Sequence, residues 1–288
     1  MHIRAFAFLT DRYVIVASHI PAPIIPEAEE PFELQPNLII LDFTMQPGTR
    51  ATVSETDYLC SFQCPVLGPR TVAIDINIRS DPAPTLSPDP ATHVPFYTAR
   101  NNRIYVVTIL TTDGRRTKSF VMFIPSTTLT SCIDNLMSDA KRQTIQWNDW
   151  GPKGTRFLQF RSPSLSSLWV CYVYGTRFVA PIDNGRSPDR TMLRVFDFDP
   201  LSLKRAILAG GHNIEDGNIL YVNEPTFLNT EGAFEGLIVT SLPYRVRRVA
   251  LPRSNDSEWP DCFNAAMLSE DNLILVGVSI FLPMSRGS

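Results

Sequence analysis

Four aspartates are the residues of this chain best suited to acid–base chemistry, because each lies on or beside a segment typical of a β-strand. They are Asp42, Asp75, Asp197 and Asp199. A glycosidase needs two carboxyl groups about 5 to 10 Å apart, one of which protonates the leaving group. The sequence does not show that separation, and aspartates at strand ends are also ordinary turn residues. These acids leave a hydrolase or lactonase open as one interpretation.

Other catalytic templates are missing from the sequence. It contains no Gly-x-Ser-x-Gly nucleophile turn, no His-Glu-x-x-His zinc helix, no EF-hand loop and no Walker-type phosphate loop. The segment 151–155 has the glycines and lysine of a phosphate loop, but their spacing is wrong and Pro152 lacks an N–H donor. We therefore predict no catalytic residue and no cofactor.

The cysteines and histidines do not indicate a metal site. Cys60 and Cys64 are the only close pair among five cysteines, and the four histidines are not at ligand spacing. A structural zinc site usually draws its ligands from two close pairs, so we expect buried free thiols and no metal. Reduced thiols and the lack of a signal-peptide core predict a cytoplasmic or nuclear protein.

Charge and hydropathy argue against two kinds of partner. The net charge is −3, whereas a nucleic-acid surface needs a concentrated basic face. A membrane span needs about 18 or more uncharged apolar residues, and the longest apolar run, 273–283, is much shorter. We expect neither nucleic acid nor membrane as a partner.

Arginines and aromatic residues recur together at turns in the second half of the chain. Segments 147–156, 172–178 and 242–245 each place an aromatic residue beside an arginine. Such residues either stack on an exposed rim that binds a partner or fill the core and tie neighbouring sheets together. Both interpretations stay open, and the candidate binding residues are Trp150, Arg156, Tyr174, Arg177, Tyr244 and Arg245.

A strand–turn–strand pattern that begins at residues 8, 96, 227 and 267 predicts an all-β fold. The intervals of 88, 131 and 40 residues approach two, three and one units of about 43, the length of a four-stranded propeller blade. The patterns at Phe8 and Met267 are the most alike, so we expect the first and last hairpins to lie side by side in a ring. The length then predicts one domain, 1–288, with six or seven blades.

Proline, at 24 residues against 14 glycines, favours strands and turns over helices. One short helix is predicted over 129–142, where apolar residues recur on one stripe. The proline-rich segments 21–36 and 81–95 are expected to be long surface loops. Further strands are predicted at 38–43, 72–78, 119–124, 169–174, 193–198 and 246–251.

The second half of the chain resembles one known family. The motifs that carry the resemblance are Trp150-Gly151-Pro152, Gly154-Thr155-Arg156, Tyr172 to Arg177, Leu242 to Arg245 and Met267 to Asp271. They are similar to the C-terminal region of F-box proteins abundant in mushroom-forming fungi, and the similarity covers mainly residues 140–280. This resemblance implies a propeller-like module that recognises the substrate of a ubiquitin ligase.

In that family, F-box helices bind the Skp adaptor of a cullin ligase. This chain starts with a predicted strand at Ile3 instead of F-box helices. The sequence therefore does not itself predict recruitment of Skp and cullin, although it still predicts binding of a protein partner. The leading interpretation is a non-catalytic protein-interaction module that resembles the substrate-recognition region of an F-box protein. The alternative is a propeller-fold hydrolase or lactonase that uses carboxylates in the central channel.

Overall fold

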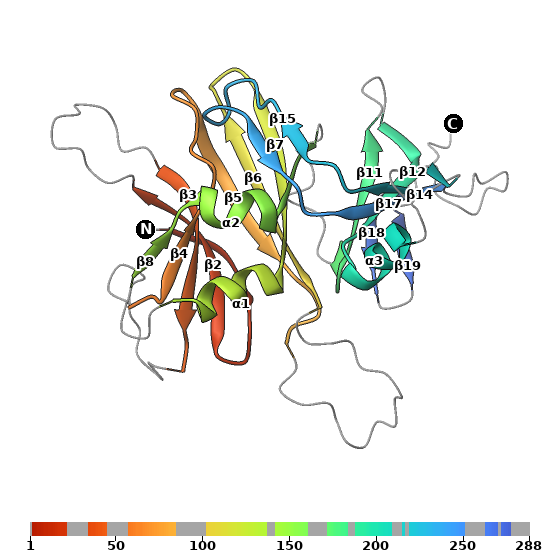
Figure 1. Ribbon diagram of the computed structural model, residues 1–288. Coiled ribbons are helices and arrows are strands. Elements are labelled where there is room, and N and C mark those ends of the chain that lie inside the picture. Colours follow the sequence, from red (N-terminus) through yellow and green to blue (C-terminus); the bar gives the residue numbers. More distant parts are fainter. Residues whose placement is uncertain are drawn as a thin grey trace, which may run out of the picture.

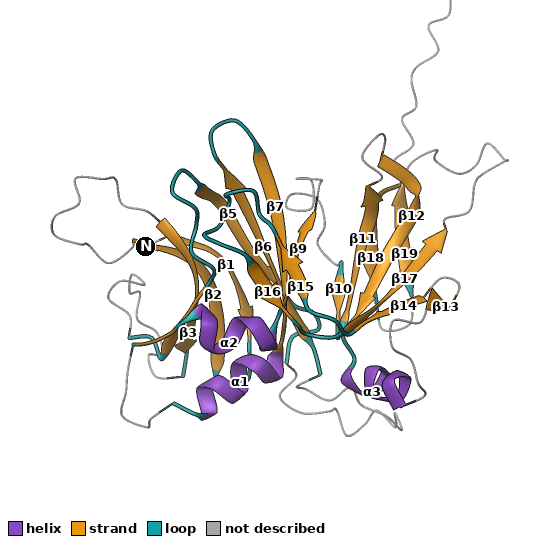
Figure 2. Cartoon of the chain, turned by 45° about the horizontal axis from the view of Figure 1, so that its top comes forward, coloured by secondary structure: helices purple, strands orange, loops and turns teal. Residues whose placement is uncertain are grey.

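In the computed structural model, most of the described residues lie in β-strands, which are arranged in several sheets with few helices (Figure 1). The description covers residues 2–21, 34–44, 57–84, 102–136, 142–160, 172–183, 188–208, 215–216, 219–250, 263–269 and 272–277. The two largest groups of strands lie on either side of a central sheet (Figure 2). The mostly β prediction is confirmed.

The N-terminal sheet contains five strands in the order β1-β2-β3-β4-β8. Their bounds are His2–Phe8 (β1), Tyr13–Pro21 (β2), Leu34–Asp42 (β3), Cys60–Gln63 (β4) and Gln143–Ile145 (β8). Strands β1 to β4 are antiparallel neighbours, and β8 pairs with β4 in parallel. The first hairpin is closed by the Thr10 hydroxyl, which accepts hydrogen bonds from the backbone N–H groups of Arg12 and Tyr13.

The central sheet contains four antiparallel strands in the order β5-β6-β7-β9. Their bounds are Val72–Arg79 (β5), Ile104–Thr112 (β6), Thr117–Pro125 (β7) and Arg156–Phe160 (β9). Most side chains of β6 and β7 are buried, although alternate residues of a strand face opposite sides of its sheet. Both faces of this sheet are therefore covered, which explains the continuous apolar runs in its sequence.

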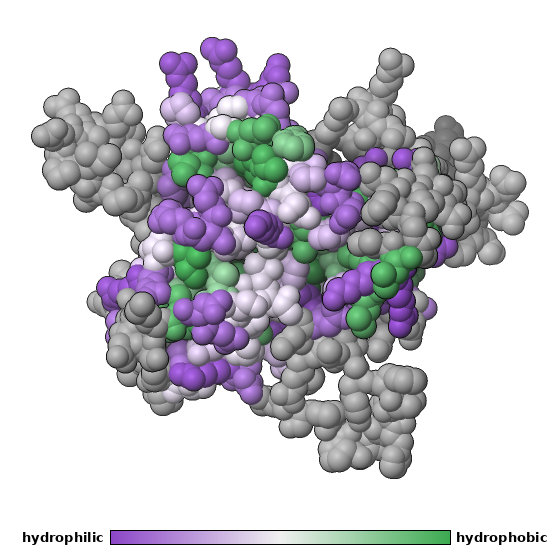
Figure 3. Space-filling view, in the orientation of Figure 1, coloured by the Kyte–Doolittle hydropathy of each residue, from purple (hydrophilic) through white to green (hydrophobic). Residues whose placement is uncertain are grey.

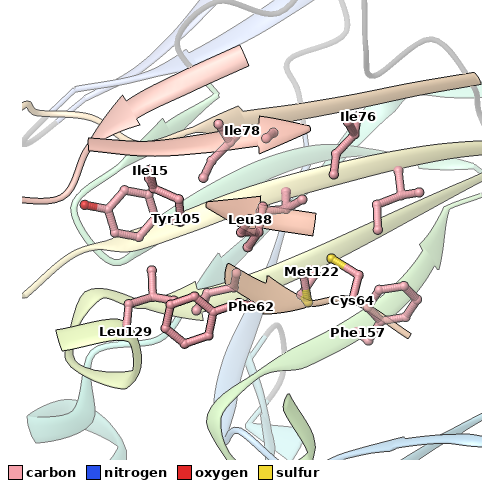
Figure 4. Close-up of a cluster of buried hydrophobic side chains, with 14 of the residues drawn as sticks. Ile15, Leu38, Phe62, Cys64, Ile76, Ile78, Tyr105, Met122, Leu129 and Phe157 are labelled. Atoms are coloured by element: carbon pink, nitrogen blue, oxygen red, sulfur yellow. The ribbon is translucent and has the colours of Figure 1, made fainter. Parts of the chain in front are cut away.

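One buried cluster fills the space between the N-terminal and central sheets; we call it the first cluster (Figure 4). Ile15, Leu38 and Phe62 enter it from the N-terminal sheet, and Tyr105 and Met122 enter it from the central sheet. Each of these side chains is fully buried. Burial of a large apolar side chain contributes about 1.5 to 3 kcal/mol, so the first cluster holds the two sheets together.

Three helices occur in the described part of the chain: α1 at Ser126–Asp134, α2 at Trp147–Gly154 and α3 at Pro200–Leu208. Helices α1 and α2 add Leu129 and Trp150 to the first cluster. The prediction of a single helix over 129–142 is therefore wrong: α1 begins earlier, and α2 occupies the segment expected to be a turn. Burial of apolar side chains stabilises these short helices more than intrinsic propensity does.

The C-terminal sheet has six strands in the order β10-β11-β12-β17-β14-β13. Their bounds are Val173–Tyr174 (β10), Arg177–Asp183 (β11), Pro188–Asp197 (β12), Glu215–Asp216 (β13), Ile219–Val222 (β14) and Tyr244–Ala250 (β17). A second cluster joins this sheet to the central sheet. In it, the Phe123 ring lies 4.9 Å from Phe178, 5.8 Å from Phe196 and 4.8 Å from Phe198, measured between ring centroids.

Two separate hairpins complete the described structure. One consists of β15 (Thr226–Leu228) and β16 (Ile238–Thr240), and the loop between these strands inserts Phe234 into the first cluster. The Phe234 ring centroid lies 5.0 Å from that of Phe120. The other hairpin consists of β18 (Phe263–Leu268) and β19 (Leu273–Gly277), and its Ala266, Leu268, Leu273 and Leu275 side chains belong to the second cluster.

The structure confirms the hairpins predicted at 8, 227 and 267, whereas the first strand of the one predicted at 96 lies outside the described residues. The first and last hairpins do not lie side by side as predicted. The first packs into one cluster and the last into the other, so the central sheet separates them (Figure 1). Similar sequences in two hairpins indicate similar local turns. They do not indicate that the hairpins are neighbours in the fold.

The two proline-rich loops lie mostly outside the described residues. The first is shorter than the predicted 21–36, because β2 extends to Pro21 and β3 already begins at Leu34. Pro36 lies within β3, opposite His19 of β2.

Candidate functional site

A pocket of about 280 Å³ opens at one end of the central sheet. Three connecting segments form its walls: residues 69–71 before β5, the turn between β6 and β7, and residues 231–233 after β15. Hydrophilic side chains project from this end of the molecule (Figure 3). The pocket is lined by Pro69, Arg70, Thr71, Thr111, Asp113, Arg116, Lys118, Glu231, Gly232 and Ala233.

The turn between β6 and β7 is built by its own residues. The Asp113 carboxylate accepts hydrogen bonds from the backbone N–H groups of Arg115 and Arg116 at 2.8 and 2.7 Å. Gly114 follows with φ +82°, a left-handed conformation that glycine adopts without steric cost. The two backbone hydrogen bonds hold the pKa of Asp113 below its usual range. The turn thereby presents the Arg116 side chain at a defined place.

The wall formed by residues 231–233 approaches the segment before β5 very closely at Gly68. The Gly68 N–H donates to the Ala233 carbonyl at 3.0 Å, and a Cβ atom at Gly68 would lie only 2.0 Å from the Gly232 carbonyl oxygen. Lys118 adds a second link, because its Nζ donates to the carbonyls of Thr230 and Glu231 at 3.1 Å each. These contacts join segments that are far apart in the sequence into one rim.

The charges that line the pocket divide into engaged and free groups. Lys118 forms an ion pair with the Glu231 carboxylate at 3.1 Å, and the Asp113 carboxylate accepts backbone hydrogen bonds within its own turn. Arg70 and Arg116 are exposed, and their side chains make no hydrogen bond or ion pair with any residue that the structure describes. The pocket therefore offers two guanidinium groups whose donors remain available to a ligand.

Three of the six residues predicted to bind a partner are buried in the interior. Trp150 is 3% exposed; its Nε1–H donates to the Gln63 carbonyl at 3.0 Å, and its ring centroid lies 5.1 Å from that of Phe62. Arg156 and Tyr244 are also buried. A side chain in such a position stabilises the fold, because a separate partner cannot contact it unless the structure opens locally.

Arg156 connects the central sheet to segments far along the chain. Its guanidinium donates to the carbonyls of Leu242 at 2.7 Å, Glu224 at 3.0 Å and Thr240 at 3.2 Å. The guanidinium carbon lies 5.0 Å from the centroid of the Tyr244 ring, a cation–π distance. Burial lowers the pKa of this guanidinium, and no carboxylate of the described residues pairs with it. Arg156 and Tyr244 therefore match the interpretation in which these aromatic residues and arginines fill the core and tie neighbouring sheets together.

The other three predicted residues lie together in the C-terminal sheet. Tyr174, Arg177, Asp197 and Arg245 occupy directly opposed positions on β10, β11, β12 and β17. Arg245 Nη2 forms an ion pair with the Asp197 carboxylate at 2.6 Å, and Arg177 Nη2 lies 3.5 Å from the Ser269 carbonyl. The structure thus brings these residues into one cross-strand row, away from the pocket.

The aspartates proposed for hydrolysis do not converge. Asp42 in the N-terminal sheet pairs with Arg12 Nε at 2.6 Å, whereas Asp197 belongs to the C-terminal sheet. Asp199 caps α3, because its carboxylate accepts from the Ser202 backbone N–H at 3.0 Å. Asp75 lies on β5 opposite Leu110. None of the four lines the pocket, and three of them have structural partners.

The described residues include no group of three or more histidines, cysteines, aspartates or glutamates that could hold a metal ion. Cys60 and Cys64 are buried free thiols, and burial raises the pKa of each to about 12. Cys171 and Cys262 lie outside the described residues. In the part of the chain that the structure covers, no helix has both the length and the apolar character of a membrane span.

The pocket residues Arg70 and Arg116 were not among the sequence-predicted sites. A local signal exists for one of them, since Asp113-Gly114-Arg115-Arg116 is a turn sequence between two strands that displays two arginines. Nothing local connects this turn to residues 69–71 or 231–233. No protein-family model, curated protein or solved structure matches this chain. The resemblance to F-box proteins therefore stays a prediction.

Proposed function

We propose that this chain is a protein-interaction module without chemistry of its own, comparable to the substrate-recognition region of an F-box protein. The observation that carries the proposal is the pocket, in which two exposed arginines have no partner among the described residues. Arginine is enriched at interface hot spots because its planar group forms directed, bidentate contacts. Groups that are neither paired nor buried are available for such contacts.

The way the sheets pack supports a propeller-like architecture for this module. The central sheet is an antiparallel four-stranded unit that packs one face against the N-terminal sheet and the other against the C-terminal sheet. Successive blades of a propeller pack face to face in the same way. We therefore propose that these sheets are propeller-type blades, with the pocket on the loops at one end of the stack.

Affinity purification of the full chain from cells that express it, followed by mass spectrometry, tests the proposed function. The enriched protein is then purified and mixed with the purified chain in a calorimeter, and we expect a Kd of about 1 µM or tighter. Co-recovery of Skp and cullin would place the module in a ubiquitin ligase, and a partner without them would indicate a separate adaptor. If no enriched protein binds in the purified system, the proposal is wrong.

The hydrolase interpretation is tested separately. No observation on the four aspartates favours it, since Asp42, Asp197 and Asp199 each have a structural role. Turnover of ester or lactone substrates by the purified chain, abolished by Asp197→Asn in a folded variant, would replace the binding proposal with catalysis.

A further inference from the structure

We infer that the pocket binds an oxyanion presented by a peptide segment of the partner, either a side-chain carboxylate or a phosphate group, with an apolar side chain next to it. This inference rests on the proposed function and adds the chemistry of the ligand. It depends on three features: unpaired cations, rigid walls and neighbouring apolar surface.

The charge of the pocket favours an anion. Of the five ionisable groups that line it, Asp113 is held by the turn and Glu231 by Lys118. The guanidinium groups of Arg70 and Arg116 come from two different walls and make no hydrogen bond or ion pair with the described residues. Guanidinium groups match the geometry of carboxylate and phosphate oxygens through parallel N–H donors. An anion placed there meets donors that do not have to leave another partner.

The walls are held in place before a ligand arrives. The Asp113 hydrogen bonds fix the turn between β6 and β7, and the contact of Gly68 with residues 232–233 and the Lys118 hydrogen bonds link the backbone segments that form the rim. Thr71 adds a further link, because its hydroxyl donates to the Gly232 carbonyl at 3.1 Å. Preorganised walls reduce the entropy cost of binding, so the free side chains alone need to be ordered.

The surface beside the pocket points to a peptide rather than a free ion. The loop that provides Glu231 continues to Glu235, whose N–H donates to the Val66 carbonyl at 2.8 Å, and then to Leu237. Val66 and Leu237 are 47% and 56% exposed. Apolar side chains are visible next to the hydrophilic end in Figure 3. An extended peptide whose acidic group enters the pocket can place an apolar side chain on Val66 and Leu237.

Binding of three dye-labelled peptides to the full chain, measured by fluorescence anisotropy at low ionic strength, tests this inference. The first peptide carries two adjacent glutamates followed by two leucines, the second has glutamines in place of the glutamates, and the third has phosphoserines there. We expect the glutamate or the phosphoserine peptide to bind at least about tenfold more tightly than the glutamine peptide. Which anionic peptide binds better identifies the source of the oxyanion.

A double charge reversal in the pocket, with a single reversal in the same turn as its control, shows whether the pocket is responsible. Arg70→Glu with Arg116→Glu should weaken binding of the anionic peptide by about tenfold or more, because two attractive contacts become repulsive. Arg115→Glu changes the charge of the same turn at a residue that does not line the pocket, and we expect a change of less than about twofold. Thermal unfolding of each variant, followed by circular dichroism, confirms that it is folded.

The outcomes separate this inference from the proposed function. Equal binding of the glutamine peptide, no binding of any peptide, or unchanged binding by the double variant would each overturn the pocket assignment. If the double variant still binds the purified partner as the native chain does, the chain remains an interaction module that uses another surface. If neither the native chain nor the double variant binds a purified partner, the proposed function itself is wrong.

Discussion

Arg103 and Arg156 are buried between segments of the chain, whereas Arg70 and Arg116 extend from turns into the pocket. The two buried arginines donate to backbone carbonyls and stack on Tyr105 and Tyr244 at 5.3 and 5.0 Å. The two pocket arginines have no such contacts with the described residues. The same side chain therefore serves the fold in one region and remains available for binding in the other.

The two regions differ in whether packing removes the guanidinium group from water. Arg103 donates to the carbonyls of Pro82 at 3.1 Å, Phe8 at 2.8 Å and Leu9 at 2.5 Å, and so ties the first hairpin to the central sheet. Burial lowers the pKa of this guanidinium, and the carbonyl oxygens together with the Tyr105 ring compensate the loss of water. In the pocket, water still solvates the arginines, and only a ligand would replace it.

The largest expected effect comes from Arg156→Ala. This substitution leaves the carbonyls of Leu242, Glu224 and Thr240 without their donor and creates a cavity beside Tyr244. We expect the free energy of unfolding to fall by about 3 to 5 kcal/mol, measured by urea denaturation. Arg156→Lys keeps the charge but not the planar fork, and its loss should be smaller. A loss below about 1 kcal/mol for Arg156→Ala would remove the contrast between the two regions.

A smaller effect is expected from Tyr105→Phe. The Tyr105 hydroxyl donates to the Phe8 carbonyl at 2.7 Å within the first cluster. The substitution removes this bond, but Arg103 still donates to the same carbonyl. We expect a loss of about 1 kcal/mol in the free energy of unfolding. A loss as large as that of Arg156→Ala would show that the Tyr105 hydroxyl secures the first hairpin and that Arg103 does not replace it.

The Asp199 carboxylate is intermediate between the buried arginines and the exposed pocket arginines, because local hydrogen bonds hold it. Burial raises the pKa of Asp199, but hydrogen bonds from the Ser202 hydroxyl and from the backbone N–H groups of Ser202 and Leu201 outweigh it, so the pKa lies below its ordinary value of 3.8. Its contribution to stability is therefore complete above that value and is lost as pH falls through the lowered pKa of the folded state.

Asp199→Ala should thus lower the free energy of unfolding by about 1 kcal/mol at neutral pH, the usual value of a helix cap. The difference from the native chain should shrink in urea titrations at more acidic pH, below the ordinary pKa of 3.8. A difference that stays constant down to acidic pH would mean that the carboxylate does not hold α3.

The smallest effect on stability is expected at the pocket. Arg70→Ala and Arg116→Ala should each change the free energy of unfolding by less than about 0.5 kcal/mol, because both side chains are exposed and unpaired among the described residues. Differential scanning calorimetry of both variants beside Arg156→Ala makes the comparison directly. A clear loss of stability would place these arginines with the structural group.

The strands were predicted well because their signals are local. Alternating or continuous apolar runs and polar turns lie within about ten residues of one another, and the turn at Thr10 needs hydroxyl contacts only two and three residues away. The helix α2 was missed because Pro152 and two glycines argue against it locally. Burial of Trp150 against Phe62 outweighs that local preference.

The location of the candidate binding residues could not be predicted in the same way. Trp150 and Arg156 lie near turns, so their sequence context left both a binding rim and a place in the core open, and the structure buries them under distant segments. The pocket arginines were missed because the walls of their pocket come from residues 69–71, 111–118 and 231–233. Only pairing of the distant segments through contacts such as Gly68 with Ala233 brings these walls together.

Local sequence patterns are enough to predict that the chain is mostly β and where several of its hairpins turn, since hydrogen bonds and side-chain alternation between neighbouring residues specify both. Which arginines are buried and which stay exposed depends on how distant segments pack. The reason is physical: Arg156 is bound by carbonyls 68 to 86 residues away, whereas Arg70 and Arg116 extend from turns beyond the sheets that would bury them. Desolvation of a long charged side chain depends on packing between distant segments, which no local pattern encodes.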